Sequence, residues 1–157
     1  MTRKSSLLLM LLAAPLSAQT AADKEAVLKP VNQLFDAMRK HDSAMARGAF
    51  APEGRLLSIS DREGKVTVRT ISPDQFAGAV GRAAGGPPWN EPIYDPEIRI
   101  DGRVATVWTW YDFLAGEKWS HCGVDAFQLA KLDDGWKITQ LVDTRYQTGC
   151  KTPAAPK

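Results

Sequence analysis

The sequence contains few of the residues on which several classes of function depend. Its 157 residues include only two cysteines and two histidines. A structural zinc site takes about four clustered Cys and His ligands, so no metal centre of this kind is expected. The sequence also has no nucleophile elbow, phosphate-binding loop or metal triad. We therefore expect neither a metal nor a nucleotide cofactor.

Long hydrophobic runs are also scarce, and the one clear run lies near the N-terminus. Residues 7–12 are apolar, two basic residues precede them, and the small residue Ala18 follows where signal peptidase would cut. The run is too short for a finished transmembrane helix, which takes about 20 apolar residues. We predict that residues 1–18 are a cleaved secretory signal peptide. The alternative is an uncleaved N-terminal anchor.

Cleavage after Ala18 predicts a periplasmic or secreted protein. No cysteine follows Ala18, so the lipid attachment of bacterial lipoproteins is not available. We expect no stable membrane association once the signal peptide is removed. Residues 19–150 have the length of one ordinary domain, and the polar tail at 151–157 is expected to be disordered.

An excess of positive charge is lacking as well. Without Arg3 and Lys4, the remaining 18 basic residues balance the 18 acidic residues. Binding of nucleic acid requires a basic patch, and the sequence has no cluster of Lys and Arg. We therefore expect no nucleic-acid partner.

Both cysteines, Cys122 and Cys150, follow the predicted cleavage site. An even number of cysteines in an exported chain favours a disulfide between them. The alternative is a pair of buried free thiols. A Cys–His nucleophile is disfavoured, because His121 and Cys122 are adjacent and would point to opposite faces of a strand.

The first half of the sequence is typical of helices. Apolar residues recur at three- and four-residue steps over 23–40, with Pro30 predicting a kink or a late start near Lys29. Asp42 and Ser72 are N-cap residues that predict two further helices. Alternating or β-rich segments predict strands at 55–60, 65–70, 93–100, 103–114, 119–132 and 136–146.

This order predicts an α+β fold in which N-terminal helices pack on a strongly curved antiparallel sheet. Long strands curve through twist and bulges. We therefore expect a cystatin-like cone with an apolar interior and an open mouth.

Three segments resemble the nuclear transport factor 2-like superfamily, also called SnoaL-like. They are the helical segment 31–42, the Pro-Glu-Gly junction 52–54 and the closing hairpin 127–138. The hairpin is the most specific and is similar to small exported bacterial members, some of them described as lumazine-binding. The resemblance implies a cystatin-like cone and often a homodimer. It implies no single function, because one fold hosts many.

Ionisable residues gather on the last two predicted strands. The Asp-Asp-Gly turn predicts that Asp125 lies opposite Asp143, with His121 and Arg145 on the same face. A histidine beside two carboxylates is a possible general acid/base arrangement, since the carboxylates favour the imidazolium form. Arg145 could hold an anionic group of a ligand.

The opposite face of this hairpin is the more apolar one, and it carries Val124, Ala126 and Ile138. Regular strands would turn that face toward the helices and place the ionisable residues outside, as a salt-bridge network or a dimer surface. A bulge near Gly123 would instead aim them into the cone. Both alternatives remain open on the sequence alone.

Two aromatic residues on the preceding strand, Trp110 and Tyr111, are candidate ligand-binding residues. A two-residue turn would place Trp110 across from His121, and a three-residue turn would place Tyr111 there. The site of ketosteroid isomerases could not be transferred to this chain, because no local motif matches Asp36 or Asp42 to its catalytic base.

We expect an exported single-domain protein that binds a small, partly apolar molecule in a cone-shaped cavity. One alternative is a cofactor-free lyase or isomerase with His121 and Asp125 as acid and base. The other is a dimeric interaction module without a ligand. Whether the protein is an enzyme is left open by the sequence.

Overall fold

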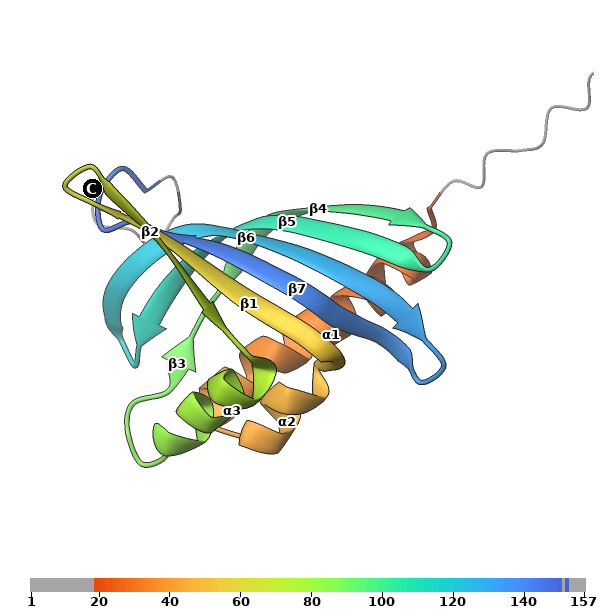
Figure 1. The fold of residues 1–157 in the computed structure, drawn as a ribbon, viewed down its shortest axis with the longest axis horizontal. Coiled ribbons are helices and arrows are strands. Elements are labelled where there is room, and N and C mark those ends of the chain that lie inside the picture. Colours follow the sequence, from red (N-terminus) through yellow and green to blue (C-terminus); the bar gives the residue numbers. More distant parts are fainter. Residues whose placement is uncertain (1–18, 151, 153–157) are drawn as a thin grey trace, which may run out of the picture.

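The computed structural model describes residues 19–150 and residue 152. The predicted signal peptide lies outside these residues. Three helices and seven strands form one layered unit in which the helices lie on one side of a curved sheet (Figure 1). The elements are α1 (Ala21–Lys40), α2 (Ser43–Gly48), β1 (Phe50–Arg62), β2 (Lys65–Ile71), α3 (Pro73–Arg82), β3 (Trp89–Asn90), β4 (Ile93–Asp101), β5 (Val104–Ala115), β6 (Lys118–Leu132) and β7 (Gly135–Arg145).

Each helix begins at a capping residue. Thr20 and Ser72 form capping boxes with Asp23 and Gln75, and the Asp42 side chain accepts a hydrogen bond from the Met45 amide. The α1 helix runs unbroken through Pro30, so the late start near Lys29 is wrong. A buried apolar stripe on α1 packs on the sheet and compensates for the backbone hydrogen bond that proline cannot make.

The sheet has the order β2-β1-β7-β6-β5-β3, and β4 also pairs with β5. All pairs are antiparallel except β1 and β7, which run parallel because β1 enters the sheet from the helical layer beside the last strand. The predicted fold class is confirmed, with this one parallel pair making the sheet mixed. Within the described residues no helix is long and apolar enough to span a membrane.

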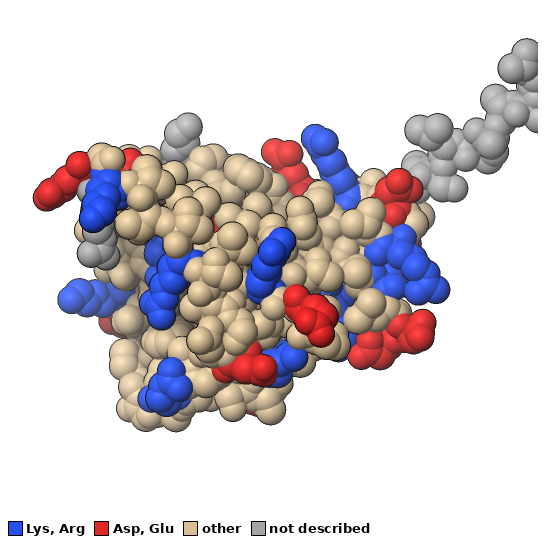
Figure 2. Space-filling view, in the orientation of Figure 1, with Lys and Arg blue, Asp and Glu red and all other residues tan. Residues whose placement is uncertain are grey.

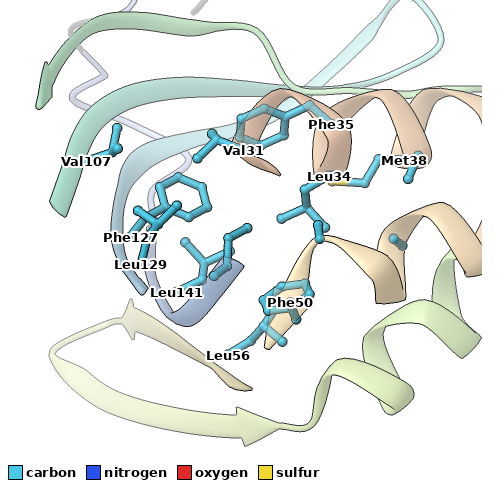
Figure 3. Packing of buried hydrophobic residues seen from close by; sticks show 14 of the residues in the cluster. Val31, Leu34, Phe35, Met38, Phe50, Leu56, Val107, Phe127, Leu129 and Leu141 are labelled. Carbon is cyan, nitrogen blue, oxygen red and sulfur yellow. The ribbon is translucent and has the colours of Figure 1, made fainter. Parts of the chain in front are cut away.

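The core lies between α1 and the inner face of the sheet (Figure 3). Phe35 of α1 meets Phe127 of β6 edge to face, with 6.1 Å between ring centroids. Both rings are almost completely buried, and each such burial stabilises the fold by about 1.5–3 kcal/mol. This packing fixes which face of β6 looks toward the helices.

The expectation that Val124 and Ala126 face the helices is wrong. Phe127 and Leu129 point inward instead, and so the face of β6 that also carries Asp125 is the inner one. On β7 the register shifts at Thr139, between the pairs Leu129–Ile138 and Gln128–Gln140. Because of this extra residue, both Ile138 and Leu141 face the core. The residues that alternate with Leu141 further along β7, Asp143 and Arg145, then also face inward.

The C-terminal segment is tied to the outer face of the sheet. Cys122 and Cys150 form the predicted disulfide, with 6.0 Å between their Cα atoms, and Cys122 pairs with Tyr146 across the sheet. Thr152 is buried, and its hydroxyl donates a hydrogen bond of 2.7 Å to Asp112. The other residues of the expected disordered tail lie outside the described residues.

Candidate functional site

A cavity of about 1340 Å³ lies between the helices, the β1–β2 hairpin and the inner face of the sheet. One side is apolar, and Figure 3 shows Leu34, Leu56 and Leu141 around this space. The other side carries ionisable residues from three elements, which are Glu91, His121, Asp125, Asp143 and Arg145. The cavity therefore has an apolar side and a polar end.

The predicted grouping of His121, Asp125, Asp143 and Arg145 is confirmed, since all four line this cavity. Asp125 lies directly opposite Asp143, as the hairpin register predicts. The alternative that placed the group outside is wrong. The bulge that brings Asp143 and Arg145 inward is at Thr139 and not near Gly123.

Glu91 also lines the cavity, although the sequence did not predict it as a site residue. Glu91 directly follows β3, which pairs with the end of β5 at Leu114 and Ala115. This pairing holds the segment of Trp89 and Glu91 against the cavity. The Glu91 side chain is partly buried. Burial, and next the negative charge of Asp143, raise the pKa of Glu91 to about 8. No motif or periodic pattern marks Glu91, which lies two residues after Trp89.

Asp125 is 1% exposed, and its Oδ2 atom has no hydrogen-bond partner among the described residues. Burial, followed by the charges of Glu91 and Asp143, raises the pKa of Asp125 well above its ordinary value. The negative charge of Glu91 is among the causes that raise the pKa of Asp125, so the two carboxyl groups oppose each other's ionisation. In such a pair the loss of both protons is unfavourable, and one carboxyl group keeps its proton more readily.

Among the described residues, Arg145 is the arginine whose charge acts on these carboxyl groups. Its Nε atom donates a hydrogen bond of 2.8 Å to Asp143 Oδ2, from the same face of β7. The Asp143 side chain is largely buried, whereas that of Arg145 is half exposed. Arg145 therefore neutralises Asp143 and leaves the Glu91–Asp125 pair to be balanced by a proton.

His121 is held in an aromatic setting. Its ring stacks on Phe113 at 4.9 Å with an interplanar angle of 22°, and it meets Tyr111 edge to face at 5.8 Å. Burial, and next the charge of Arg145, lower the pKa of His121 to about 4. His121 is therefore neutral at neutral pH, contrary to the expectation that the carboxylates would favour imidazolium.

The two aromatic candidates lie in different places. Phe113, rather than Trp110 or Tyr111, pairs with His121, because the register shifts between Phe113 and Leu114. Trp110 pairs with Val124, and the strand alternation puts it on the face of β5 away from the cavity.

Tyr111 is a buried support beneath the site. Its hydroxyl donates a hydrogen bond of 2.8 Å to the Thr144 carbonyl. Its ring crosses Gly123, where an added Cβ would lie 2.8 Å from the ring and 1.8 Å from the Thr144 oxygen. Gly123 therefore allows Tyr111 to reach β7 and hold the strand that presents Asp143 and Arg145.

Figure 2 shows Lys and Arg interspersed with Asp and Glu on the face in view, so this face has no dominant charge. Within the described part of the chain, no group of three or more His, Cys, Asp or Glu residues has the geometry to hold a metal ion. The arrangement offers hydrogen bonding and proton exchange at one end of an apolar space.

A family model described as "Putative lumazine-binding" matches residues 22–142. Solved structures match the fold over most of the chain. A cystatin-like protein of unknown function from Nostoc punctiforme has a TM-score of 0.63 at 13% identity, covering 87% of this chain and 96% of that one. A nuclear transport factor 2-like protein of unknown function from Shewanella baltica has a TM-score of 0.62 at 18% identity, covering 83% and 98%.

A third similar structure is a nuclear transport factor 2-like protein with a cystatin-like fold from Novosphingobium aromaticivorans. Its TM-score is 0.63 at 11% identity, covering 85% of this chain and 86% of that one. No curated protein matches the chain. These identities are low, so the structures support the fold alone, and the predicted resemblance to the superfamily is confirmed.

Proposed function

Because the chain belongs to the family described as "Putative lumazine-binding", we propose that it binds a small, partly apolar molecule in the cavity between its helices and its sheet. The observation that carries the proposal is the division of the cavity into an apolar side and a polar end that contains the buried Asp125. Ligand sites in proteins are typically concave, largely apolar and provided with a few convergent polar groups.

The size of the cavity supports a ligand of several rings or an elongated chain. Its volume of about 1340 Å³ exceeds the roughly 300–1,000 Å³ that is common for drug-sized ligands. Leu34, Met38 and Phe76 would contact the apolar part, while the carboxyl groups and Arg145 would orient the polar part. Affinity would come from apolar burial and selectivity from the polar end.

A fluorescence titration tests this proposal with an uncharged probe, N-phenyl-1-naphthylamine, and calorimetry tests lumazine, which the family description names. Ala79 lines the cavity and Ala84 does not, so Ala79→Trp should abolish probe binding while Ala84→Trp should leave it unchanged. Equal binding to both variants would show that the probe sits elsewhere. Failure of the unmodified protein to bind any probe would refute the proposal.

Native mass spectrometry of protein purified from its own host adds an independent test. A co-purifying small molecule that is absent from an Ala79→Trp copy would identify the natural ligand of the cavity. The same spectrum reports whether the protein is a monomer or the expected homodimer. A bare chain in both samples would favour the interaction module without a ligand.

Export belongs to the same proposal. A signal peptide over residues 1–18 and the Cys122–Cys150 disulfide both fit a protein that folds in an oxidising compartment. The intact mass of the protein from its host should correspond to a chain that begins at Gln19. A mass that retains residues 1–18 would support the N-terminal anchor instead.

A cofactor-free lyase or isomerase is the second candidate. The observation that favours it is the Glu91–Asp125 pair, in which one carboxyl group can donate a proton while the other accepts one. His121 is neutral and could assist as a hydrogen-bonding group. If a ligand of the cavity is turned over, Glu91→Gln should abolish turnover, while the uncharged probe should still bind.

A further inference from the structure

Extending the proposed function, on which this step rests, we propose that the polar end of the cavity binds the positively charged nitrogen of an organic cation. The ligand class is an amine or a protonated nitrogen heterocycle attached to an apolar body. The cation would lie between the carboxyl groups of Glu91, Asp125 and Asp143 and a neighbouring aromatic wall. In the ligand-free protein, the proton shared by Glu91 and Asp125 takes the place of this cation.

The balance of charge in the polar end is the first argument. Three carboxyl groups face one guanidinium, and that guanidinium is bound to Asp143. The remaining charged residues that line the cavity are exposed and balance one another, with two of each sign, namely Asp61, Glu63, Arg69 and Arg82. The buried end therefore has an excess of negative charge that only a proton or a bound cation can offset.

The Asp125 side chain supplies a second, independent argument. It is 99% buried, lines the cavity and has an oxygen atom, Oδ2, without a hydrogen-bond donor among residues 19–150 and 152. A buried acceptor without a donor costs about 1–3 kcal/mol. A hydrogen-bond donor from a ligand would satisfy this acceptor, and a protonated nitrogen supplies both the donor and a positive charge.

Aromatic rings beside the carboxyl groups are the third argument. Three aromatic rings line the cavity, those of Trp89, Phe113 and His121. The centroid of the Phe113 ring lies 6.1 Å from that of Trp89 and 4.9 Å from that of His121. Trp89 is two residues from Glu91 on the same segment. Aromatic faces next to carboxylates attract ammonium groups through the ring quadrupole. An anion or a neutral carbonyl would gain nothing from this wall.

Binding of the cation should release the shared proton. The groups around Glu91 and Asp125 are Asp143 and Arg145 on β7, His121 on β6 and Tyr111 on β5. Tyr111 keeps its proton throughout, and His121 is neutral above about pH 4. Because the pKa of Glu91 is about 8, affinity for the cation should rise as the pH increases toward about 8 and then level off.

The experiment compares three ligands that share one apolar body and differ in charge. Phenethylamine is the cation, phenethyl alcohol is neutral and phenylpropionate is the anion. Calorimetry at about pH 7 should show that the amine binds at least about tenfold more tightly than the alcohol, which corresponds to about 1.4 kcal/mol. The anion should bind most weakly.

Two variants and one control variant test whether the preference for the amine over the alcohol depends on the carboxyl groups at the polar end. Glu91→Gln and the double variant Glu91→Gln/Asp125→Asn should reduce the preference for the amine to less than about twofold, because each removes negative charge at the polar end. Glu97 is exposed on the outer face of the sheet and does not line the cavity. Glu97→Gln should therefore keep the preference of the unmodified protein.

Failure of this inference can be distinguished from failure of the proposed function. If N-phenyl-1-naphthylamine binds to the protein but phenethylamine and phenethyl alcohol bind with equal affinity, the cation site is overturned. The cavity would then remain a binding site. A preference for the amine that survives in the double variant would also overturn it. Loss of binding for every probe would overturn the proposed function itself.

Discussion

Raising the pH from about 6.5 to about 8 should destabilise this protein, in contrast to the usual behaviour of carboxyl groups. The pKa of Glu91 is raised from 4.5 to about 8 in the folded state, because the side chain is partly removed from water and lies near the negative charge of Asp143. Between these values the folded chain holds a proton that the unfolded chain has lost. The free energy of unfolding therefore falls as the pH rises through this range.

His121 has the opposite effect over part of the same range. Its pKa is lowered from 6.5 to about 4 by burial and by Arg145. Between these values the unfolded chain binds a proton that the folded chain does not, so stability rises with pH. The two contributions cancel between about pH 4.5 and 6.5, and only the Glu91 contribution remains above that range.

The magnitude follows from the width of the remaining window. From pH 6.5 to about 8 there are about 1.5 pH units, and each contributes about 1.4 kcal/mol, giving a loss of about 2 kcal/mol. Asp125 has its pKa raised for the same reason and contributes with the same sign.

Urea unfolding of the oxidised protein, measured at intervals from about pH 5 to about pH 9, tests this reasoning. Glu91→Gln should flatten the decline above pH 6.5, and Glu97→Gln should leave it unchanged. His121→Gln should extend the decline downward to about pH 4.5, since the opposing contribution is removed. An equal slope in the unmodified protein and in Glu91→Gln would refute the assignment.

Two further predictions concern the support of the site and the C-terminal segment. Gly123→Ala should lower the free energy of unfolding by about 2–3 kcal/mol or more, because the new Cβ would overlap the Thr144 carbonyl and the Tyr111 ring; a loss below about 1 kcal/mol in urea unfolding would contradict the packing described. Replacing both Cys122 and Cys150 by Ser should cost about 2–4 kcal/mol, since the bridge joins residues separated by 28 positions. A thermal denaturation profile unaffected by this double replacement would show that the disulfide does not constrain the unfolded chain.

Local features of the fold could be predicted because their causes are local. The predicted capping residues Asp42 and Ser72 determine where two of the helices begin through hydrogen bonds spanning three residues. The Asp-Asp-Gly turn correctly predicts Asp125 opposite Asp143. Near the turn the actual pairing is offset by one residue, and the extra residue at Thr139 restores the predicted register further along the strand.

The orientation of the site could not be predicted in the same way. Val124 and Ala126 are as apolar as the residues of a core face, yet the larger Phe127 and Leu129 occupy the core because they fill the space beside Phe35. The bulge at Thr139 then decides that Asp143 and Arg145 face the cavity. Both choices depend on packing between elements far apart in the sequence.

The sequence by itself predicted the three helices, six of the seven strands along the chain, the disulfide pair and four of the polar residues that line the cavity. Only the tertiary structure decided that Glu91 lies beside these four residues, that His121 is neutral, and that the pKa of Asp125 is raised so that it retains a proton more readily. The physical reason is that patterns of capping, turns and periodicity act over a few residues. Burial and charge–charge interactions depend on distances across the folded chain, and these set the chemistry of the cavity.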